Sequence, residues 1–123
     1  MKLRLYQNSI RMRAQIPEVE TIKTTGVIEA FVRLGPNNND KLIYKVKFDD
    51  SSDLNIEFHD REVIMHVPKE TGRQWAESEE VGIYGSQDLG GGKHLKILLE
   101  KDFKCLDNTD EDQSIMYPNP RQA

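Results

Sequence analysis

Polar and apolar residues alternate with a period of two in four pairs of segments. Segments 2–6 and 10–14 alternate on either side of the turn-forming residues 7–9, which predicts a β-hairpin. The same pattern predicts strand pairs at 27–34 and 42–48, at 54–58 and 62–67, and at 81–86 and 94–101. The intervening segments 35–40 and 87–92 are rich in Gly, Asn and Asp and are expected to be loops. The chain should therefore contain about eight strands.

Two prolines mark the expected starts of two short helices. Pro17 suits the first helical turn because its fixed φ is already helical and its missing N–H needs no partner there. A helix over 17–25 is predicted, and Gly26 can end it in the left-handed conformation. Pro68 opens a second predicted helix that runs to about residue 78, with Trp75 as its buried anchor.

The order strand, strand, helix, strand, strand occurs twice. Apolar positions of the first hairpin recur at a spacing of 51, as for Leu3 with Leu54 and Met12 with Val63. This suggests a duplicated ββαββ unit with pseudo-repeats at 1–50 and 51–103. We predict one α+β domain over 1–103, with antiparallel strands in a curled sheet or barrel-like sandwich and two short helices. An acidic tail, 104–123, is expected to follow it.

Composition narrows the class of protein. The chain has 123 residues and a formal net charge of −4, which argues against a general nucleic-acid binder. Its apolar runs are far shorter than a membrane span, and the amino-terminal segment lacks the apolar core of a secretion signal. The single cysteine, Cys105, cannot form an internal disulfide. We therefore expect a cytoplasmic protein without a membrane partner.

The first hairpin concentrates positive charge. Residues 1–13 carry four cations and no acid, so the net charge of −4 leaves −8 on the remaining 110 residues. Strand alternation places these cations on one face of the hairpin: Lys2, Arg4, Arg11 and Arg13. Arginine forks at strand spacing can hold a phosphate or carboxylate, which makes this face a candidate anion-binding site. A solvated outer face, or one neutralised by the acidic tail, is the alternative.

Other candidate sites have weaker patterns. His59, His66 and His94 lack the spacing of known metal motifs, so no metal is expected. The run Gly90-Gly91-Gly92-Lys93 resembles a phosphate loop in composition, but its spacing differs and a strand follows it, so it is expected to be a hairpin loop. No base is evident beside Cys105. The sequence thus predicts neither a catalytic constellation nor a cofactor.

Several short motifs together resemble a known group of proteins. They are Met1-Lys2-Leu3-Arg4-Leu5, Asn8-Ser9-Ile10-Arg11-Met12-Arg13, Glu18-Val19-Glu20, Val67-Pro68-Lys69, Trp75-Ala76, Glu100-Lys101-Asp102-Phe103-Lys104-Cys105-Leu106-Asp107, Glu111-Asp112-Gln113-Ser114 and Tyr117-Pro118-Asn119-Pro120. The combination is similar to a family of small uncharacterised bacterial proteins, each a single domain of unknown function. The resemblance covers nearly the whole chain and implies a bacterial cytosolic protein, but no chemistry.

Three functional hypotheses remain open. The first is a non-enzymatic binding or accessory module for an anionic small molecule or a protein partner. The second is a phosphate-compound hydrolase that resembles the antiparallel tunnel enzymes acting on triphosphates. That family's Glu-x-Glu-x-Lys signature is absent, because Lys2, Arg4 and Tyr6 occupy the alternating positions. The third is a structural subunit that assembles through edge strands, and the sequence does not fix the oligomeric state.

Overall fold

The computed structural model describes residues 1–103 and contains eight strands and two helices. In chain order they are β1 (Lys2–Tyr6), β2 (Ser9–Ala14), α1 (Ile16–Thr25), β3 (Val27–Arg33), β4 (Lys41–Asp49), β5 (Asn55–His59), β6 (Glu62–Pro68), α2 (Lys69–Glu77), β7 (Gly82–Gly90) and β8 (Lys93–Lys101). The predicted α+β class is confirmed. The expected acidic tail at 104–123, with Cys105, lies outside the described residues.

The strands form two four-stranded sheets, in the orders β1-β2-β8-β7 and β3-β4-β6-β5. Each sheet joins two antiparallel hairpins through a parallel central pair, β2 with β8 and β4 with β6. The prediction of purely antiparallel pairing was therefore wrong at the centre of each sheet. Alternation within a hairpin sets its own pairing, whereas contacts between distant segments decide which hairpins meet. Neither sheet closes into a barrel.

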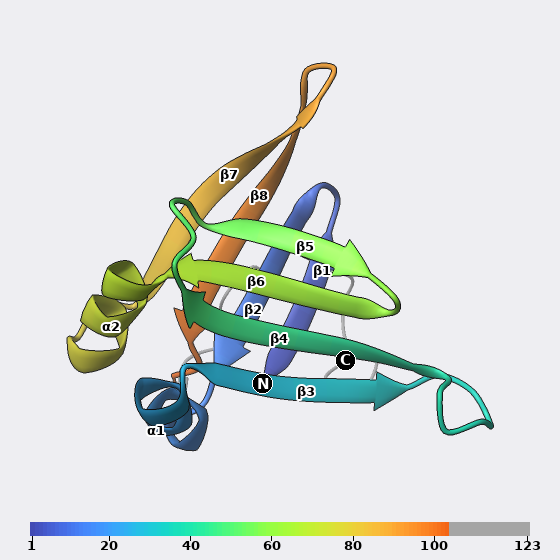
Figure 1. The fold of residues 1–123 in the computed structure, drawn as a ribbon, viewed down its shortest axis with the longest axis horizontal. Helices are drawn as coiled ribbons and strands as arrows, with labels where there is room; N and C mark the ends of the chain where they lie inside the picture. Colours follow the sequence, from blue (N-terminus) through green and yellow to red (C-terminus); the bar gives the residue numbers. More distant parts are fainter. Residues whose placement is uncertain (104–123) are drawn as a thin grey trace, which may run out of the picture.

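The two sheets pack face to face, and their strands cross (Figure 1). The inner faces share one core with both helices, which lie side by side at one end of the sandwich. Met12 and Leu99 come from one sheet, Val46 and Met65 from the other, and all four are fully buried. Because each sheet contains one hairpin from each half of the chain, neither half could bury its inner face alone.

Local sequence explains both helices. The Glu18 carboxylate accepts a hydrogen bond of 2.8 Å from the Gln15 N–H at the start of α1, and Gly26 ends that helix at a φ of 82°. Helix α2 packs its small residue Gly72 against the Phe48 ring. Trp75, fully buried, donates a hydrogen bond of 3.1 Å from its indole N–H to the Val81 carbonyl.

The last hairpin is longer than predicted. Residues 87–90 continue β7 instead of forming a loop, and β8 begins at Lys93. The three glycines Gly90, Gly91 and Gly92 all have positive φ, which confines the reversal to two residues. In Figure 1 this hairpin projects beyond the sandwich.

The pairing of the strands gives the spacing between corresponding residues of the two halves. Gln7 and Asp60, the first residues of two hairpin turns, have φ values of 50° and 49° and lie 53 positions apart. The pair Met12–Leu99 in the parallel centre of one sheet corresponds to Met65–Val46 in the other. The spacing of 51 used for the first hairpin was therefore two residues short. The duplication of a ββαββ unit stays a hypothesis.

Candidate functional site

The four cations of the first hairpin lie together on the outer face of the sheet β1-β2-β8-β7. We call Lys2, Arg4, Arg11 and Arg13 the basic face. Lys2 lies directly opposite Arg13 and Arg4 directly opposite Arg11 across the β1–β2 ladder. This face points away from the second sheet, so it is on the side of the molecule turned from the viewer in Figure 1.

Acidic residues at the end of β8 contact three of these cations. The Nε atoms of Arg11 and Arg13 lie 3.3 Å and 3.5 Å from the same Glu100 Oε1. The Tyr84 hydroxyl donates to the other oxygen of Glu100 at 3.0 Å, and burial together with this bond raises the pKa of Tyr84. The Lys2 ammonium lies 3.0 Å from Asp102. One carboxylate thus forms ion pairs with two guanidinium groups at their Nε atoms, and the buried Nε of Arg11 has no hydrogen-bond acceptor within residues 1–103.

Arg4 has a different environment. Its guanidinium lies 5.7 Å from the centre of the Tyr6 ring, a cation–π contact on the exposed surface. Members of the basic face are absent from the lining of the pockets at α1–α2, at the β3–β4 turn, at the start of α1 and beside Asp60, all formed by residues within 1–103. Because Ile10, Met12 and Ala14 of β2 are buried in the core, the alternate residues Arg11 and Arg13 lie on the outer face of this sheet.

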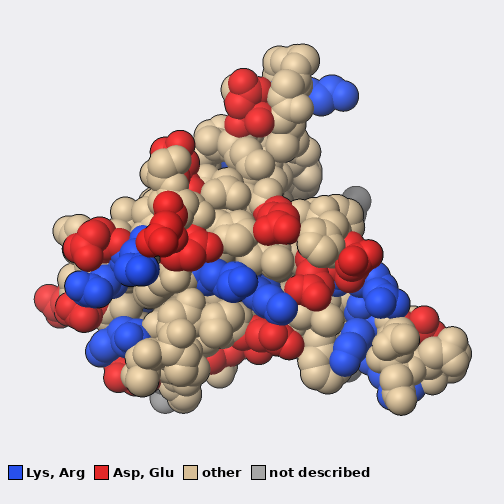
Figure 2. Space-filling model, in the orientation of Figure 1, with Lys and Arg blue, Asp and Glu red and all other residues tan. Residues whose placement is uncertain are grey.

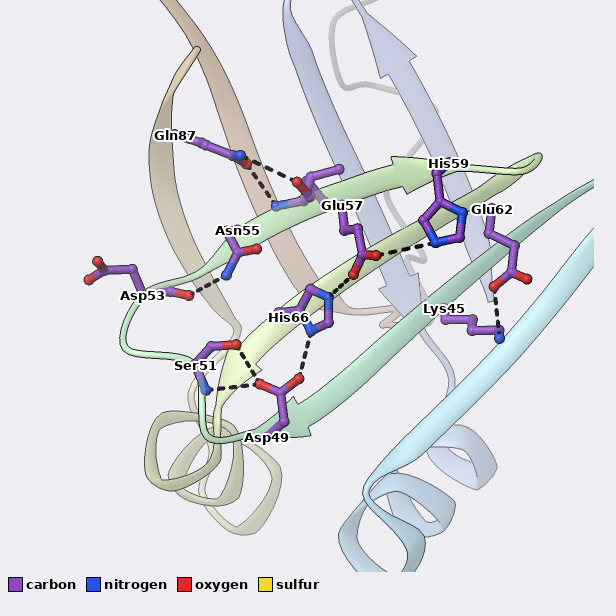
Figure 3. Close-up of polar contacts among 11 residues, drawn as sticks. Lys45, Asp49, Ser51, Asp53, Asn55, Glu57, His59, Glu62, His66 and Gln87 are labelled. Carbon is purple, nitrogen blue, oxygen red and sulfur yellow. Dashed lines mark hydrogen bonds and ion pairs between the residues drawn. The ribbon is translucent and has the colours of Figure 1, made fainter. Parts of the chain in front are cut away.

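A second polar cluster, which we call the His66 cluster, lies on the outer face of the other sheet. It consists of Asp49, Ser51, Glu57, His59 and His66. His66 Nδ1 is 2.6 Å from an oxygen of Asp49, and Nε2 is 2.8 Å from an oxygen of Glu57. Figure 3 shows the imidazole bridging β4 and β5 across β6. The second Glu57 oxygen faces His59 at 3.4 Å.

The hydrogen bonds of the His66 cluster stabilise the charged forms of His66, Asp49 and Glu57. Burial opposes the charged imidazole, but hydrogen bonds to Asp49 and Glu57 outweigh it and raise the pKa of His66. The bond to His66 lowers the pKa of Glu57. Burial raises the pKa of Asp49, yet hydrogen bonds from Ser51 and His66 outweigh it and lower the pKa overall. Lys47, the cross-strand neighbour of His66 on β4, adds a further cation. The cluster therefore favours a protonated imidazole between two carboxylates.

The geometry of the His66 cluster differs from that of a nucleophilic triad. The Ser51 hydroxyl donates to Asp49 at 2.6 Å instead of to the imidazole. Both ring nitrogens of His66 already have carboxylate partners. Among residues 1–103, no group of three acidic, His or Cys side chains has a geometry that could hold a metal ion. His94 lies on β8, in the other sheet. The cluster joins three strands electrostatically.

Charges of both signs are interspersed on the face that carries the His66 cluster (Figure 2). Lys45 Nζ, for example, lies 2.8 Å from Glu62 and 3.7 Å from Glu29. The hydrogen bond to Glu62 outweighs burial and raises the pKa of Lys45. This balanced face contrasts with the basic face, where within residues 1–103 four cations are contacted by two carboxylates, Glu100 and Asp102.

Sequence reasoning treated His59 as a turn residue and His66 as a strand residue, and it missed the contact of both with Glu57. The available signal was a single polar residue, His66, inside the apolar run from Val63 to Val67. Alternation predicts that His66 lies on the outer face. Its partners depend on the register between strands, which could not be predicted from the sequence. The run Gly90–Lys93 forms the tip of the β7–β8 hairpin, as expected for a turn.

Comparison with known proteins gives a family but no activity. No helix in the part of the chain that the structure describes has the length and apolar character needed to cross a membrane. No curated protein and no solved structure matches the chain significantly. One family model, described as "Family of unknown function (DUF7009)", matches residues 1–121. Because this match covers nearly the whole chain, the protein belongs to that family of unknown function.

Proposed function

We propose that this protein is a non-enzymatic binding module that receives an anionic partner on its basic face. The observation that carries the proposal is the pairing of like charges, Lys2 opposite Arg13 and Arg4 opposite Arg11. Directly opposed like charges on a sheet destabilise it, by roughly 0.2–1 kcal/mol for each pair. Two such unfavourable pairs on one face are typical of a functional surface, because sequences usually avoid like charges at opposed strand positions unless function requires them.

The arrangement of Glu100 supports an anion as the ligand. Its contacts with Arg11 and Arg13 are at Nε, and no side-chain hydrogen bond within residues 1–103 uses the Nη donors of either guanidinium group. Among residues 1–103, two guanidinium groups face one carboxylate, which leaves an excess positive charge, and Arg4 adds to it. Planar forks of this kind favour phosphate or carboxylate oxygens.

The outer position of the basic face favours an extended ligand. A small molecule usually binds in a pocket that buries most of its surface. The basic face instead offers cations spaced along two strands, which suits an acidic protein surface or a chain of phosphates. Such partners gain from complementary charge chiefly in association rate and specificity.

The hydrolase alternative finds less support. The tunnel enzymes require a closed barrel, whereas neither sheet closes here. The basic face and the His66 cluster lie on the outer faces of different sheets, and packed sheets are about 10 Å apart. A phosphate held by Arg11 and Arg13 would therefore lie beyond the reach of His66.

Titration with tripolyphosphate and with poly-L-glutamate tests the proposal. We expect both anions to bind at low ionic strength and to weaken steeply at higher salt. The double variant Arg4→Gln/Arg13→Gln should bind at least about tenfold more weakly, which corresponds to roughly 1.4 kcal/mol. The matched control Lys47→Gln/Lys93→Gln changes the net charge equally at exposed positions off this face and should stay close to wild type. Absence of binding by the wild-type chain, or equal losses in both variants, would refute the proposal.

A further inference from the structure

The two sheets have four edge strands within residues 1–103, and the backbone groups of β5 and β1 differ in whether a side chain bonds them. The edges are β1 and β7 in one sheet and β3 and β5 in the other. An edge strand presents unpaired backbone N–H and C=O groups, which another chain can use. Proteins usually cover such edges, so an uncovered edge indicates a place where a partner strand can add.

The edge of β5 is covered by a side chain from the other sheet. The Ile56 N–H donates to the Gln87 side-chain oxygen at 2.7 Å, and the Gln87 amide donates back to the Ile56 carbonyl at 3.3 Å. Figure 3 shows this pair of bonds. The Gln87 amide thus satisfies the same backbone groups that a neighbouring strand would, and we call this contact the Gln87 clasp.

The other half of the chain lacks a clasp at the corresponding place. Leu3 corresponds to Ile56, because these residues pair with Met12 and Met65 at equivalent positions of the two hairpins. Val32 corresponds to Gln87, because these residues pair with Leu42 and Leu95. Valine has no amide to offer, and Val32 is 46% exposed. Within residues 1–103, no side chain bonds the backbone of Leu3.

The backbone groups at this edge point outward. Gln87 bonds both polar groups of Ile56, which shows that this register position faces away from the neighbouring strand. The two hairpins have the same two-residue turns and the same pairing up to that position. In an antiparallel ladder such positions alternate, so the N–H and C=O groups of Leu3 and Leu5 both face the open edge of β1.

Exposed apolar side chains lie on the inner face of β1 and on the inner face of the sheet opposite it. The strands of the front sheet extend past β1 in Figure 1. Leu5, Phe58 and Leu34 are 64%, 70% and 72% exposed. Leu34 and Phe58 line an open apolar pocket of about 510 Å³ together with Leu42. A segment laid along β1 could cover inner-face apolar groups with every second side chain.

Positive charge lies on the outer side of the same edge. Lys2 and Arg4 alternate with Leu3 and Leu5 along β1 and belong to the basic face. The remaining side chains of an added segment would lie beside these two cations. Acidic residues at those positions would meet complementary charge, whereas basic residues would be repelled.

We propose that the edge of β1 accepts an extended segment of a partner protein in which apolar and acidic side chains alternate. Backbone hydrogen bonds to Leu3 and Leu5 would supply affinity, and alternate side chains would supply specificity. The preference for acidic residues rests on the proposed function of the basic face. Addition of the strand rests on the open edge and is independent of that function.

A fluorescent peptide of Glu-Val repeats, about as long as β1, is the probe. With the full chain we expect saturable binding, weaker binding of a Lys-Val peptide, and slowed hydrogen exchange at the amides of Leu3 and Leu5. The decisive variant is Val32→Gln, which places an amide side chain at the register position that corresponds to Gln87. We expect it to weaken peptide binding about tenfold, the effect of roughly one to two lost hydrogen bonds.

Two controls separate the clasp from other effects of substitution. Phe31→Gln places the same side chain one residue away on the opposite face of β3, and it should leave peptide affinity within about twofold. Val32→Thr keeps the shape of valine but cannot bond both backbone groups, and it should also bind the peptide. Circular dichroism verifies that each variant is folded.

Other outcomes would overturn the inference. Equal binding of the Glu-Val and Lys-Val peptides would refute the preference for acidic side chains, and unchanged exchange at Leu3 and Leu5 would refute addition of a strand at this edge. A doubled mass in solution that Val32→Gln abolishes would assign the edge to a second copy. Binding that requires replacement of the acids between 107 and 112 would assign it to the chain's own carboxyl-terminal segment. Val32→Gln should keep its affinity for tripolyphosphate, so failure here is distinct from failure of the proposed function.

Discussion

Replacing Gln87 with leucine should destabilise the protein by removing both bonds of the Gln87 clasp. The bonds are 2.7 Å and 3.3 Å long, and both lie in a partly buried region. Leucine would leave the N–H and C=O of Ile56 without their protein partner. A buried polar group left unsatisfied costs about 1–3 kcal/mol, and partial access of water reduces that cost. We expect the free energy of unfolding to fall by about 1–2 kcal/mol in total.

Thermal and chemical unfolding measure this loss. For a chain of this length, each kcal/mol should lower the Tm by roughly 4 °C, so a fall of about 4–8 °C is expected. Hydrogen exchange should localise the effect, because the Ile56 amide loses its acceptor. The variant Gln87→Glu keeps an acceptor for that amide but loses the donor to the carbonyl, so it should protect the amide and recover part of the stability.

A matched substitution on α2 controls for the change of residue type. Gln74 is exposed, so Gln74→Leu should change the free energy of unfolding by less than about 0.5 kcal/mol. If Gln87→Leu and Gln74→Leu were equally stable, and the Ile56 amide exchanged at the wild-type rate in both, the clasp would contribute nothing. The comparison between the β5 and β1 edges would then lose its basis.

Three further predictions follow from other contacts. In Gly72→Ala the new Cβ would lie 2.6 Å from the Phe48 ring. We expect the free energy of unfolding in urea to fall by about 1–3 kcal/mol, although alanine has the better helix propensity. Adding Phe48→Leu should restore part of this stability. The raised pKa of His66 stabilises the fold fully below its ordinary value of 6.5, and this contribution is lost as pH rises through the raised value. The stability difference between wild type and His66→Gln should therefore be larger at pH 5.5 than at pH 8.5, and a difference independent of pH would contradict the charged bridge. Glu100→Gln removes the carboxylate shared by two arginines, so the affinity for tripolyphosphate should rise several-fold in a titration, and an unchanged or lower affinity would count against the basic face.

Local sequence predicted the elements of this fold because each element depends on near neighbours. Alternation placed Met12 inside and Arg11 and Arg13 outside, and the register of the strands agrees with this division. Gly26 ends α1 as expected, because the left-handed conformation costs glycine little. The sequence predicted a loop over 87–92, but residues 87–90 continue β7. A bulge near Asp88 lets these polar residues stay paired with β8.

The pairing of hairpins could not be predicted from alternation. Ile10 lies beside Ile97 in a parallel pair, although 87 positions separate them in the sequence. Any hairpin with one apolar face could have packed beside any other, and the two helices fix the choice by linking opposite sheets. The His66 cluster depends on the same information, because its members come from three strands. Sequence reasoning therefore identified the outward faces but not the contacts on them.

Corresponding positions of the two halves are similar where they face the core and different where they face outward. Inner positions keep their character, as Met12 and Met65 do, because both sheets must fill one core. Outer positions do not, since Arg4 corresponds to Glu57 and Arg13 to His66 at the same register. If packing alone governed these surfaces, both could carry balanced charges at lower electrostatic cost. Cations are concentrated on β1, whose edge no side chain within residues 1–103 covers at Leu3, whereas the matching β5 carries acids and the Gln87 clasp, and this difference supports the proposal that a partner binds at β1.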